Sequence, residues 1–518
     1  MSSAEPVYPP PPLQGWRLIA GTVVLSTATF MNVLDVSIAN VSIPAISGDL
    51  GVSPNQGTWV ITSFAVANGI SLPLTGWLAQ RFGPVRLFVT SVLLFTLVSW
   101  LCGLAPNIGS LILLRIIQGA VAGPMIPLSQ ALLLGSYPRE KSGMALAMWS
   151  MTSLVAPVVG PVLGGWITDN INWAWIFYIN VPVGIFAATA TWFLYREREA
   201  PTHRRPVDMV GLVLLVLWVG CFQVVLDKGQ ELDWFESSTI ITLSILAAVG
   251  FCVFLIWELT DDHPVVDIAL FGNRNFWTAT VTIALGYGAF FGNLVLLPLW
   301  LQQFMGYTPT MAGLAMAPVG LLALLVSPWV GKNITRYDAR WFASFGFTVF
   351  AFVLWMRTQF NTDADFVTII IPTILQGAAI GTFFIPLFNL ALQGIPPEKI
   401  SSASGLMNFA RITAGAFGAS VATTAWDHRA TLHHAYISEH IDATNRVATG
   451  LLTQLPHPAW SDAKVYAQIN RVIDQQAFML AANDIFLASA FLFIGLLVFV
   501  WLARPIRAKA GVDTGGAH

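Results

Sequence analysis

Long apolar stretches recur along the whole sequence. A helix needs about 20 largely apolar residues to cross a bilayer, because lipid offers no hydrogen-bonding partner to the backbone. The chain of 518 residues is 55% hydrophobic and only 10% charged, whereas about a quarter of a soluble domain is charged. The pattern predicts an all-α polytopic membrane protein with 14 transmembrane helices, near residues 17–40, 57–80, 85–104, 109–133, 143–168, 175–195, 208–227, 238–258, 276–303, 311–331, 341–357, 366–392, 402–425 and 484–503.

The loops between these stretches differ in charge. Lysine and arginine gather in loops on the side of segment 195–205, whereas segment 227–236 on the other side is acidic. Cytoplasmic loops of membrane proteins are enriched in Lys and Arg, and an even number of spans places both termini on one side. We therefore expect cytoplasmic tails at 1–16 and 504–518.

One loop on the opposite side is much longer than the others. It runs from 426 to 483 and contains five of the eight histidines. Its pattern predicts two amphipathic helices broken at Leu455-Pro-His-Pro458, and hence a helical hairpin that projects from the membrane. His433, His434 and His440 lack the cysteines or clustered carboxylates that would complete a metal site, so we expect a solvated helix face and no metal.

The two halves of the sequence resemble each other. Matching segments lie at nearly constant offsets, such as 118–128 with 376–387 and 73–81 with 328–336. Such duplication in parallel orientation is typical of transporters built from two similar bundles. We expect two six-helix bundles with two inserted helices between them. Their expected limits are 17–196 for the N-terminal bundle, 207–259 for the inserted helices, and 275–503 for the C-terminal bundle including hairpin 426–483.

A single carboxylate, Asp35, lies inside the first apolar stretch. At membrane depth a charged group costs about 2.5–3.5 kcal/mol on translocon scales, so it persists by facing a wet cavity, pairing or taking a proton. We expect Asp35 to be a proton carrier. The alternative is a structural acid held in a permanent hydrogen bond to Asn32, Asn40 or Ser37.

Arg115 is the corresponding cation of the first half. Its guanidinium keeps its charge, so it can favour ionised Asp35 or hold the cavity wall through Gln118. The alternative is an arginine near a helix end that extends to water. In the repeat, Asp35 falls opposite Gly288 or Ala289 and Arg115 opposite Thr373, so this pair belongs to the N-terminal half alone.

The second half contains its own intramembrane cation, Arg411, with no acid on its own helix before Asp427. We expect it to face a central cavity and meet a polar or anionic substrate; pairing with Asp35 across the cavity is the alternative. For each of the other candidates taken singly, the first interpretation is a lipid-facing or packed core residue, and a place on the cavity wall is the alternative. The candidate substrate-binding residues are Asn32, Asn68, Tyr287, Phe291, Asn293, Gln302, Phe384, Asn408 and Arg411.

Several segments match known signatures. The segments 34–44, 76–86, 115–119 and 156–165 resemble motifs of the major facilitator superfamily, and more narrowly of its fourteen-span drug:proton antiporters of the EmrB type. Segments 57–64, 175–184 and 232–235 extend the resemblance over nearly the whole chain. Two departures are present: Gln80 stands where the superfamily commonly has Asp, and the second half lacks the Gly-Pro signature of 156–165.

The resemblance implies gating or conformational roles for one set of residues. In the 156–165 signature, paired glycines permit helix bending and close approach, which we expect at the seam between the two bundles. Arg81 and Arg86 could hold one side shut, or be ordinary positive residues of a cytoplasmic loop. The gating candidates are Gly76, Arg81, Gly83, Arg86, Gly160, Pro161, Gly164 and Gly165.

The resemblance also implies a function. It predicts a proton-coupled antiporter of the bacterial inner membrane that exports hydrophobic drugs and toxic compounds by alternating access, without a cofactor and driven by the proton gradient. The implied partners are hydrophobic small molecules, protons, the lipid bilayer, a periplasmic adaptor (membrane fusion protein) and an outer-membrane channel. The alternative within transport is an exporter of a narrow substrate such as a fatty acid or siderophore.

Two other classes of protein have little support in the sequence. A membrane-embedded enzyme would need a metal motif of the His-Glu-x-x-His type or a phosphate-binding loop, and neither occurs. The formal net charge of -2 does not favour nucleic-acid binding.

Overall fold

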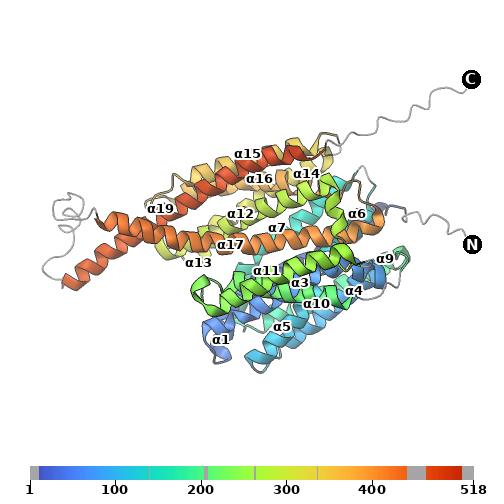
Figure 1. Ribbon diagram of the computed structural model, residues 1–518, viewed down its shortest axis with the longest axis horizontal. Coiled ribbons are helices and arrows are strands. Elements are labelled where there is room, and N and C mark those ends of the chain that lie inside the picture. Colours follow the sequence, from blue (N-terminus) through green and yellow to red (C-terminus); the bar gives the residue numbers. More distant parts are fainter. Residues whose placement is uncertain are drawn as a thin grey trace, which may run out of the picture.

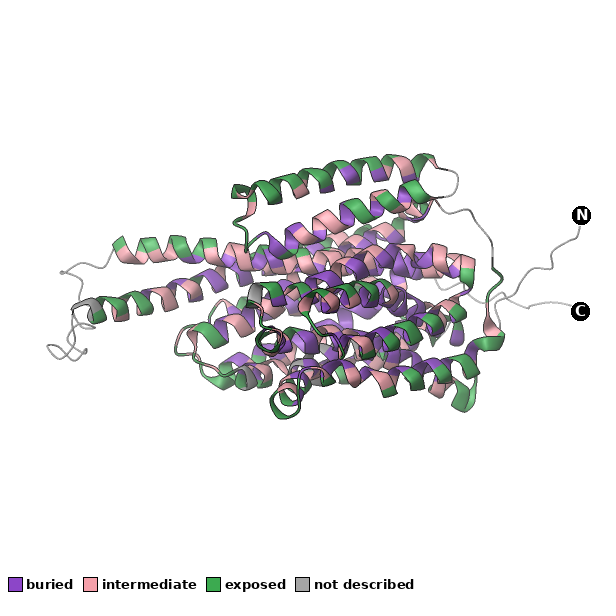
Figure 2. Ribbon diagram, turned by 90° about the horizontal axis from the view of Figure 1, so that it is seen from below, coloured by how far each residue is buried: buried purple, intermediate pink, exposed green. Residues whose placement is uncertain are grey.

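The described chain folds into two bundles of long helices that lie side by side (Figure 1). The computed structural model describes residues 11–138, 141–202, 208–261, 264–334, 336–439 and 462–504, and the regular elements in these ranges are all helices. Residues 11 and 504 lie at one end of the molecule, here called the terminal end. The opposite end is called the hairpin end. Buried residues concentrate where helices pack together, and exposed residues cover the periphery (Figure 2).

The N-terminal bundle contains six of the expected spans. Its fourth span is divided into two helices because Pro124 lacks the backbone N–H that would continue the first one. The elements are α1 (Gly15–Asp49), α2 (Pro54–Gly57), α3 (Trp59–Phe82), α4 (Pro84–Cys102), α5 (Ile108–Ala122), α6 (Met125–Ser136), α7 (Ser142–Asn170), α8 (Trp175–Tyr178) and α9 (Asn180–Tyr195).

The C-terminal bundle repeats this arrangement after two inserted helices. Here the second span is divided, at Ala317 and Pro318. The elements are α10 (Met209–Lys228) and α11 (Ser238–Thr260), followed by α12 (Arg274–Phe304), α13 (Pro309–Met316), α14 (Val319–Asn333), α15 (Ala339–Arg357), α16 (Phe366–Leu392), α17 (Ile400–Glu439) and α19 (Asp462–Phe499).

Among the described residues, 11 helices are long and apolar enough to cross a membrane. This confirms the polytopic helical class. The three other expected spans coincide with α7, with α13 together with α14, and with α17. The number fourteen stays a prediction.

The hairpin helices are continuous with two spans, whereas the sequence predicts spans that end near 425 and begin near 484. α17 runs for 40 residues and α19 for 38, so each continues from a span into the hairpin without interruption. The physical reason is the absence of proline and glycine between 419 and 439 and between 462 and 494, so nothing ends either helix. The break expected at 455–458 lies outside the described residues.

The glycines shared by both halves lie at matching helix crossings. A Cβ added to Gly119 on α5 would overlap the Phe64 carbonyl of α3, and one added to Gly377 on α16 would overlap the Val319 carbonyl of α14. The expected close packing at these repeated glycines is confirmed, because only a residue without a side chain lets the two backbones approach this far.

Two helix pairs form the seam between the bundles. α3 packs on α17, and α14 packs on α7. A Cβ added to Gly76 would lie 2.7 Å from the Ser402 Cα, and one added to Gly331 would lie 2.6 Å from the Gly143 carbonyl oxygen. α3 and α14 run toward the terminal end, so these tight contacts close the molecule there. We call them the terminal-end seam.

The helix crossings predict how glycine substitutions change stability. Gly119→Ala and Gly377→Ala should each destabilise the protein by about 1–3 kcal/mol, since the added methyl forces two backbones apart. Gly135→Ala is the matched control, because its Cβ would meet nothing within 4 Å. Thermal unfolding of the purified variants measures the difference, and equal melting temperatures for all three would contradict the close-packing account.

Candidate functional site

Asp35 lies in the interior of the N-terminal bundle, where four helices meet. It is 2% exposed. Its Oδ2 accepts a hydrogen bond from Arg115 Nη1 on α5 at 2.6 Å. Its Oδ1 accepts one from Asn180 Nδ2 on α9 at 2.8 Å and a longer one from Gln118 Nε2 at 3.4 Å. Both carboxylate oxygens therefore have donors, as a buried ionised carboxylate needs.

Arg115 is held by the N-terminal bundle through Nε, Nη1 and an aromatic ring. Its side chain is fully buried, so the interpretation that it extends to water is wrong. Nε donates to the Val60 carbonyl at 3.0 Å, and Nη1 donates to Gln118 Oε1 at 2.7 Å. The guanidinium carbon lies 4.3 Å from the ring centre of Phe64. The planar, delocalised cation is suited to this mixture of carbonyl, carboxylate and aromatic contacts.

The proposed structural partners of Asp35 on its own helix point elsewhere. Asn32 Nδ2 donates to the Ala122 carbonyl at 3.2 Å. Ser37 packs against Gly160 of α7, and Asn40 is exposed. The hydrogen bonds found on Asp35 come from α5 and α9, so the carboxylate joins three helices.

Asn180 is the part of this site that sequence reasoning missed. Its amide nitrogen donates to Asp35 and, at 3.0 Å, to Ser99 Oγ on α4. Ser99 Oγ in turn donates to the Phe177 carbonyl at 3.0 Å. The available signal was an asparagine at the start of an apolar span, since polar groups at membrane depth usually have a partner.

The buried carboxylate and the buried guanidinium depend on each other. A buried ion pair gains little net stability, because attraction only offsets the loss of hydration, but breaking it leaves a costly unpaired charge. A proton on Asp35 would leave Arg115 with neutral acceptors alone, namely Gln118 Oε1 and the Val60 carbonyl. Protonation of this one carboxyl group therefore changes the forces between α1 and α5.

The C-terminal bundle has a buried arginine at the related place, but on another helix. Arg357 is fully buried at the end of α15. Its Nη2 donates to Gln376 Oε1 at 2.7 Å and to Thr373 Oγ1 at 3.4 Å. Gln376 is the repeat counterpart of Gln118. In the described part of the chain no carboxylate lies within ion-pair distance of Arg357. Among the described residues, a fully buried arginine therefore pairs with an acid in the N-terminal bundle and not at Arg357.

Five of the candidate substrate residues gather on one wall of the C-terminal bundle. Tyr287 stacks on Phe291 at 5.7 Å and meets Phe384 edge-on at 5.7 Å. The guanidinium carbon of Arg411 lies 4.8 Å from the Tyr287 ring centre, and its Nη2 donates to Asn408 Oδ1 at 3.1 Å. Arg411 contacts this wall, not Asp35.

The other four candidates are not brought to this wall. Asn293 Nδ2 donates to Ser489 Oγ of α19 at 2.9 Å, within the C-terminal bundle. Gln302 is exposed near the hairpin end of α12. Asn32 and Asn68 are buried in the N-terminal bundle.

The gating candidates divide between two places. Gly76 lies in the terminal-end seam, as described above. A Cβ on Gly160 would overlap Ser37, and one on Gly164 would lie 3.1 Å from the Ile38 carbonyl, whereas one on Gly165 would meet nothing within 4 Å. Gly160 and Gly164 therefore pack α7 on α1 within the N-terminal bundle, and not between the bundles as expected. The side chain of Pro161 is not among those that the structure describes.

The charged gating candidates contact their own bundle. Arg86 N and Val85 N donate to the Glu199 carboxylate at 2.9 and 3.0 Å, and Gly83 leaves room for that carboxylate. Arg81 lies over the Trp77 ring at 5.3 Å. These contacts fasten the start of α4 to the segment after α9.

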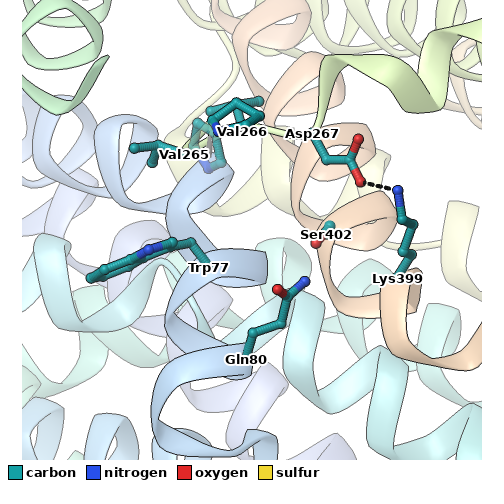
Figure 3. Close-up of a pocket in the computed structure, with 9 residues that line it drawn as sticks. Trp77, Gln80, Val265, Val266, Asp267, Lys399 and Ser402 are labelled. Carbon is teal, nitrogen blue, oxygen red and sulfur yellow. Dashed lines mark ion pairs between the residues drawn. The ribbon is translucent and has the colours of Figure 1, made fainter. Parts of the chain in front are cut away.

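A cavity of about 160 Å³ opens beside the terminal-end seam (Figure 3). The segment after α11 covers it with Val265 and Val266, and Asp267 Oδ2 pairs with Lys399 Nζ at 2.7 Å. Gln80 lines the cavity from α3. At the position where the resemblance leads one to expect an acid, the seam thus has a neutral amide.

Comparisons with known proteins agree with this architecture. Residues 25–419 match the Major Facilitator Superfamily. The chain is 50% identical over 496 residues to the "Multidrug export protein EmrB" of Haemophilus influenzae, covering 96% of this chain and 97% of that one. It is 47% identical over 495 residues to the "Fatty acid resistance protein FarB" of Neisseria gonorrhoeae, covering 96% and 98%. The crystal structure of the human organic anion transporter MFSD10 (TETRAN) shares the fold, with a TM-score of 0.56, 13% identity and coverage of 92% and 99%.

The Asp35 site predicts how its charges contribute to stability. Arg115→Met should destabilise the protein by about 3–5 kcal/mol, because it leaves a buried carboxylate without its cation. Adding Asp35→Leu should recover much of that loss, since both charges are then removed together. A double-mutant cycle measured by thermal unfolding tests this coupling, and purely additive losses would show that the two side chains do not stabilise each other.

Proposed function

Because the chain belongs to the Major Facilitator Superfamily, we propose that it is a proton-coupled antiporter that exports hydrophobic drugs and toxic compounds by alternating access. The observation that carries the proposal is the buried Asp35–Arg115 pair, the one place in the described spans where an acid and a cation pair with both side chains at most 1% exposed. The high identity to a protein named for multidrug export supports the export role.

The orientation follows from the charge of the loops. Positive loops lie at the terminal end, so we place that end in the cytoplasm of a bacterial inner membrane and the hairpin in the periplasm. The terminal-end seam is closed by Gly76 and Gly331 against Ser402 and Gly143. This arrangement is closed toward the cytoplasm, as an exporter must be when it releases its substrate outside.

The proton cycle follows from the contacts of Asp35. While ionised, Asp35 holds α1 to α5 and α9 through Arg115 and Asn180. A proton taken up from the periplasmic side removes the attraction to Arg115, which weakens this junction. Because α1 also packs tightly on Gly160 and Gly164 of α7, a shift of α1 passes to a helix of the terminal-end seam. The return of the proton to the cytoplasm restores the pair.

The wall of Tyr287, Phe291, Phe384 and Arg411 is the substrate site in this proposal. Aromatic rings suit flat hydrophobic compounds of many shapes. A second candidate function is export of a narrow class of amphipathic acids, such as fatty acids. The buried cation Arg411 beside aromatic rings favours it, and one relative is named for fatty acid resistance. Resistance profiles against drugs and against long-chain acids distinguish the two.

The hairpin is the element we assign to partner proteins. α17 and α19 extend from the membrane domain at the hairpin end (Figure 1). At the base, Arg429 and His433 contact Asp484 at 2.5 and 2.8 Å, which braces the two helices against each other. A braced pair of long helices in the periplasm would suit a periplasmic adaptor that leads to an outer-membrane channel.

The proton role of Asp35 is tested by Asp35→Asn in proteoliposomes. The amide keeps the shape but cannot exchange a proton, so substrate binding should persist while transport driven by an imposed pH gradient falls at least tenfold. Asp49→Asn is the matched control on the same helix, because its carboxylate accepts a bond from Trp173 Nε1 at 2.7 Å outside the Asp35 site. Gradient-driven transport that survives in Asp35→Asn would overturn the assignment.

The partner role of the hairpin is tested by shortening it. His434 Nε2 and Asn470 Oδ1 lie 3.1 Å apart, so the two helices are adjacent there. Replacing residues 436–468 with a short glycine-rich turn should therefore preserve the fold and transport in vesicles, while resistance in cells is lost. Full resistance in cells would argue against docking, and loss of transport in vesicles would show that the hairpin serves the membrane domain itself.

A further inference from the structure

A hydrogen-bonded chain runs from the Tyr287–Arg411 wall to the terminal-end seam. Arg411 Nη2 donates to Asn408 Oδ1 at 3.1 Å. Asn408 Nδ2 donates across the bundle boundary to Gln130 Oε1 at 3.2 Å, and Ser404 Oγ donates to the same oxygen at 2.5 Å. Gln130 belongs to α6 of the N-terminal bundle, whereas the other three residues belong to α17. The chain therefore connects Arg411, which lies over the Tyr287 ring, to a contact between bundles.

All the uncharged members of this chain are completely buried. Gln130, Ser404 and Asn408 are each 0% exposed, and Arg411 is 8% exposed. A buried amide that loses a partner costs about as much as the hydrogen bond itself contributes, so each bond here matters to closure. Opening of the seam must break both bonds to Gln130 Oε1.

The orientation of the Asn408 amide decides whether the bond to Gln130 exists. Its Oδ1 accepts from Arg411, which leaves Nδ2 directed at Gln130 Oε1 and the Ser404 carbonyl. If the Asn408 amide were flipped, its Nδ2 would face the Arg411 donor and its Oδ1 would face the acceptor Gln130 Oε1. Neither pair of atoms could form a hydrogen bond. The fixed donor character of guanidinium therefore selects the amide orientation that closes the seam.

The duplicated half provides a natural comparison. Asn389 on α16 is the repeat counterpart of Gln130, and its Nδ2 donates across the boundary to Ser142 Oγ on α7 at 3.3 Å. No arginine is bonded to Ser142 or Asn389 in the described contacts. Among the described contacts, the bridge through Asn408 is connected to the Tyr287–Arg411 wall, and the bridge through Asn389 is not.

We propose that Arg411 is a positioning residue for the cytoplasmic gate: it orients Asn408 so that α17 bonds to Gln130 and the terminal-end seam closes. Occupation of Arg411 by an acceptor group of the substrate would compete for the donor that orients Asn408. Substrate occupancy and seam closure would then affect each other. This inference rests on the alternating-access function proposed above and adds a substrate-independent role to Arg411.

The test measures seam opening without substrate or gradient. Ser402→Cys places a thiol in the closed seam, where Ser402 is 8% exposed, in a background whose three native cysteines are replaced by alanine. The rate of maleimide labelling of the purified protein then reports opening. Arg411→Met, which keeps an unbranched chain over Tyr287, should raise this rate about two- to tenfold, the factor expected for loss of one hydrogen bond.

Double variants separate positioning from a general loss of stability. In an Asn408→Leu background, Arg411→Met should cause no further rise, because the bond it controls is already absent. In an Asn389→Ala background it should raise the rate by its full factor, because that bridge is independent. An unchanged rate in Arg411→Met, or a full additional factor in the Asn408→Leu background, would overturn the proposal.

Two further measurements keep the result interpretable. If Arg411→Met does not fold, as judged by its melting temperature, Arg411→Leu supplies the same cycle, since it also removes every donor that could orient Asn408. Arg411→Gln retains an amide donor and should label at a rate closer to that of the parent protein than Arg411→Met does. A residue that only contacts substrate would leave all these rates unchanged. Failure of proton coupling would appear instead in the Asp35→Asn assay.

Discussion

Lipid supplies no hydrogen bonds, so a polar group of this protein that leaves water can gain a partner only from within the chain. This constraint explains why Asp35 lies where α1, α5 and α9 can each reach it. It also explains why Gln130, Ser404 and Asn408 meet at the boundary between bundles, where one amide oxygen accepts two bonds. These buried polar groups therefore connect separate helices and, at Gln130, the two bundles.

The duplication gives the two halves the same packing and different chemistry. Gly119 and Gly377 bring equivalent helices together at equivalent crossings. The arginines differ: Arg115 on α5 meets a carboxylate, whereas Arg357 reaches the counterpart glutamine from α15 and meets neutral groups. In the proposed function, the bundle with the buried Asp35–Arg115 pair would respond to protons, while the other presents Arg411 and its aromatic neighbours.

The two sites reach the terminal-end seam by different routes. Asp35 acts on α1, which packs through Gly160 and Gly164 on α7. Arg411 acts through Asn408 on the bond to Gln130 of α6. Since α7 and α17 each contribute to one half of the seam, a proton at one site and a substrate at the other would influence the same closure. In the proposed function, this arrangement would link export to proton entry without direct contact between Asp35 and Arg411.

The sequence alone determined the membrane class, the duplicated bundles, the inserted pair, and Asp35 and Arg115 as the ionisable groups of the first half. These follow from hydropathy, repeat offsets and the cost of charge in lipid, which are properties of the chain taken segment by segment. Only the tertiary structure showed Asn180 on Asp35, the buried Arg357, the packing of Gly160 on α1, and the path from Arg411 to Gln130. Each of these depends on which faces of distant helices meet. A polar residue in an apolar span signals that a partner exists, but only the packing of helices decides which residue that partner is.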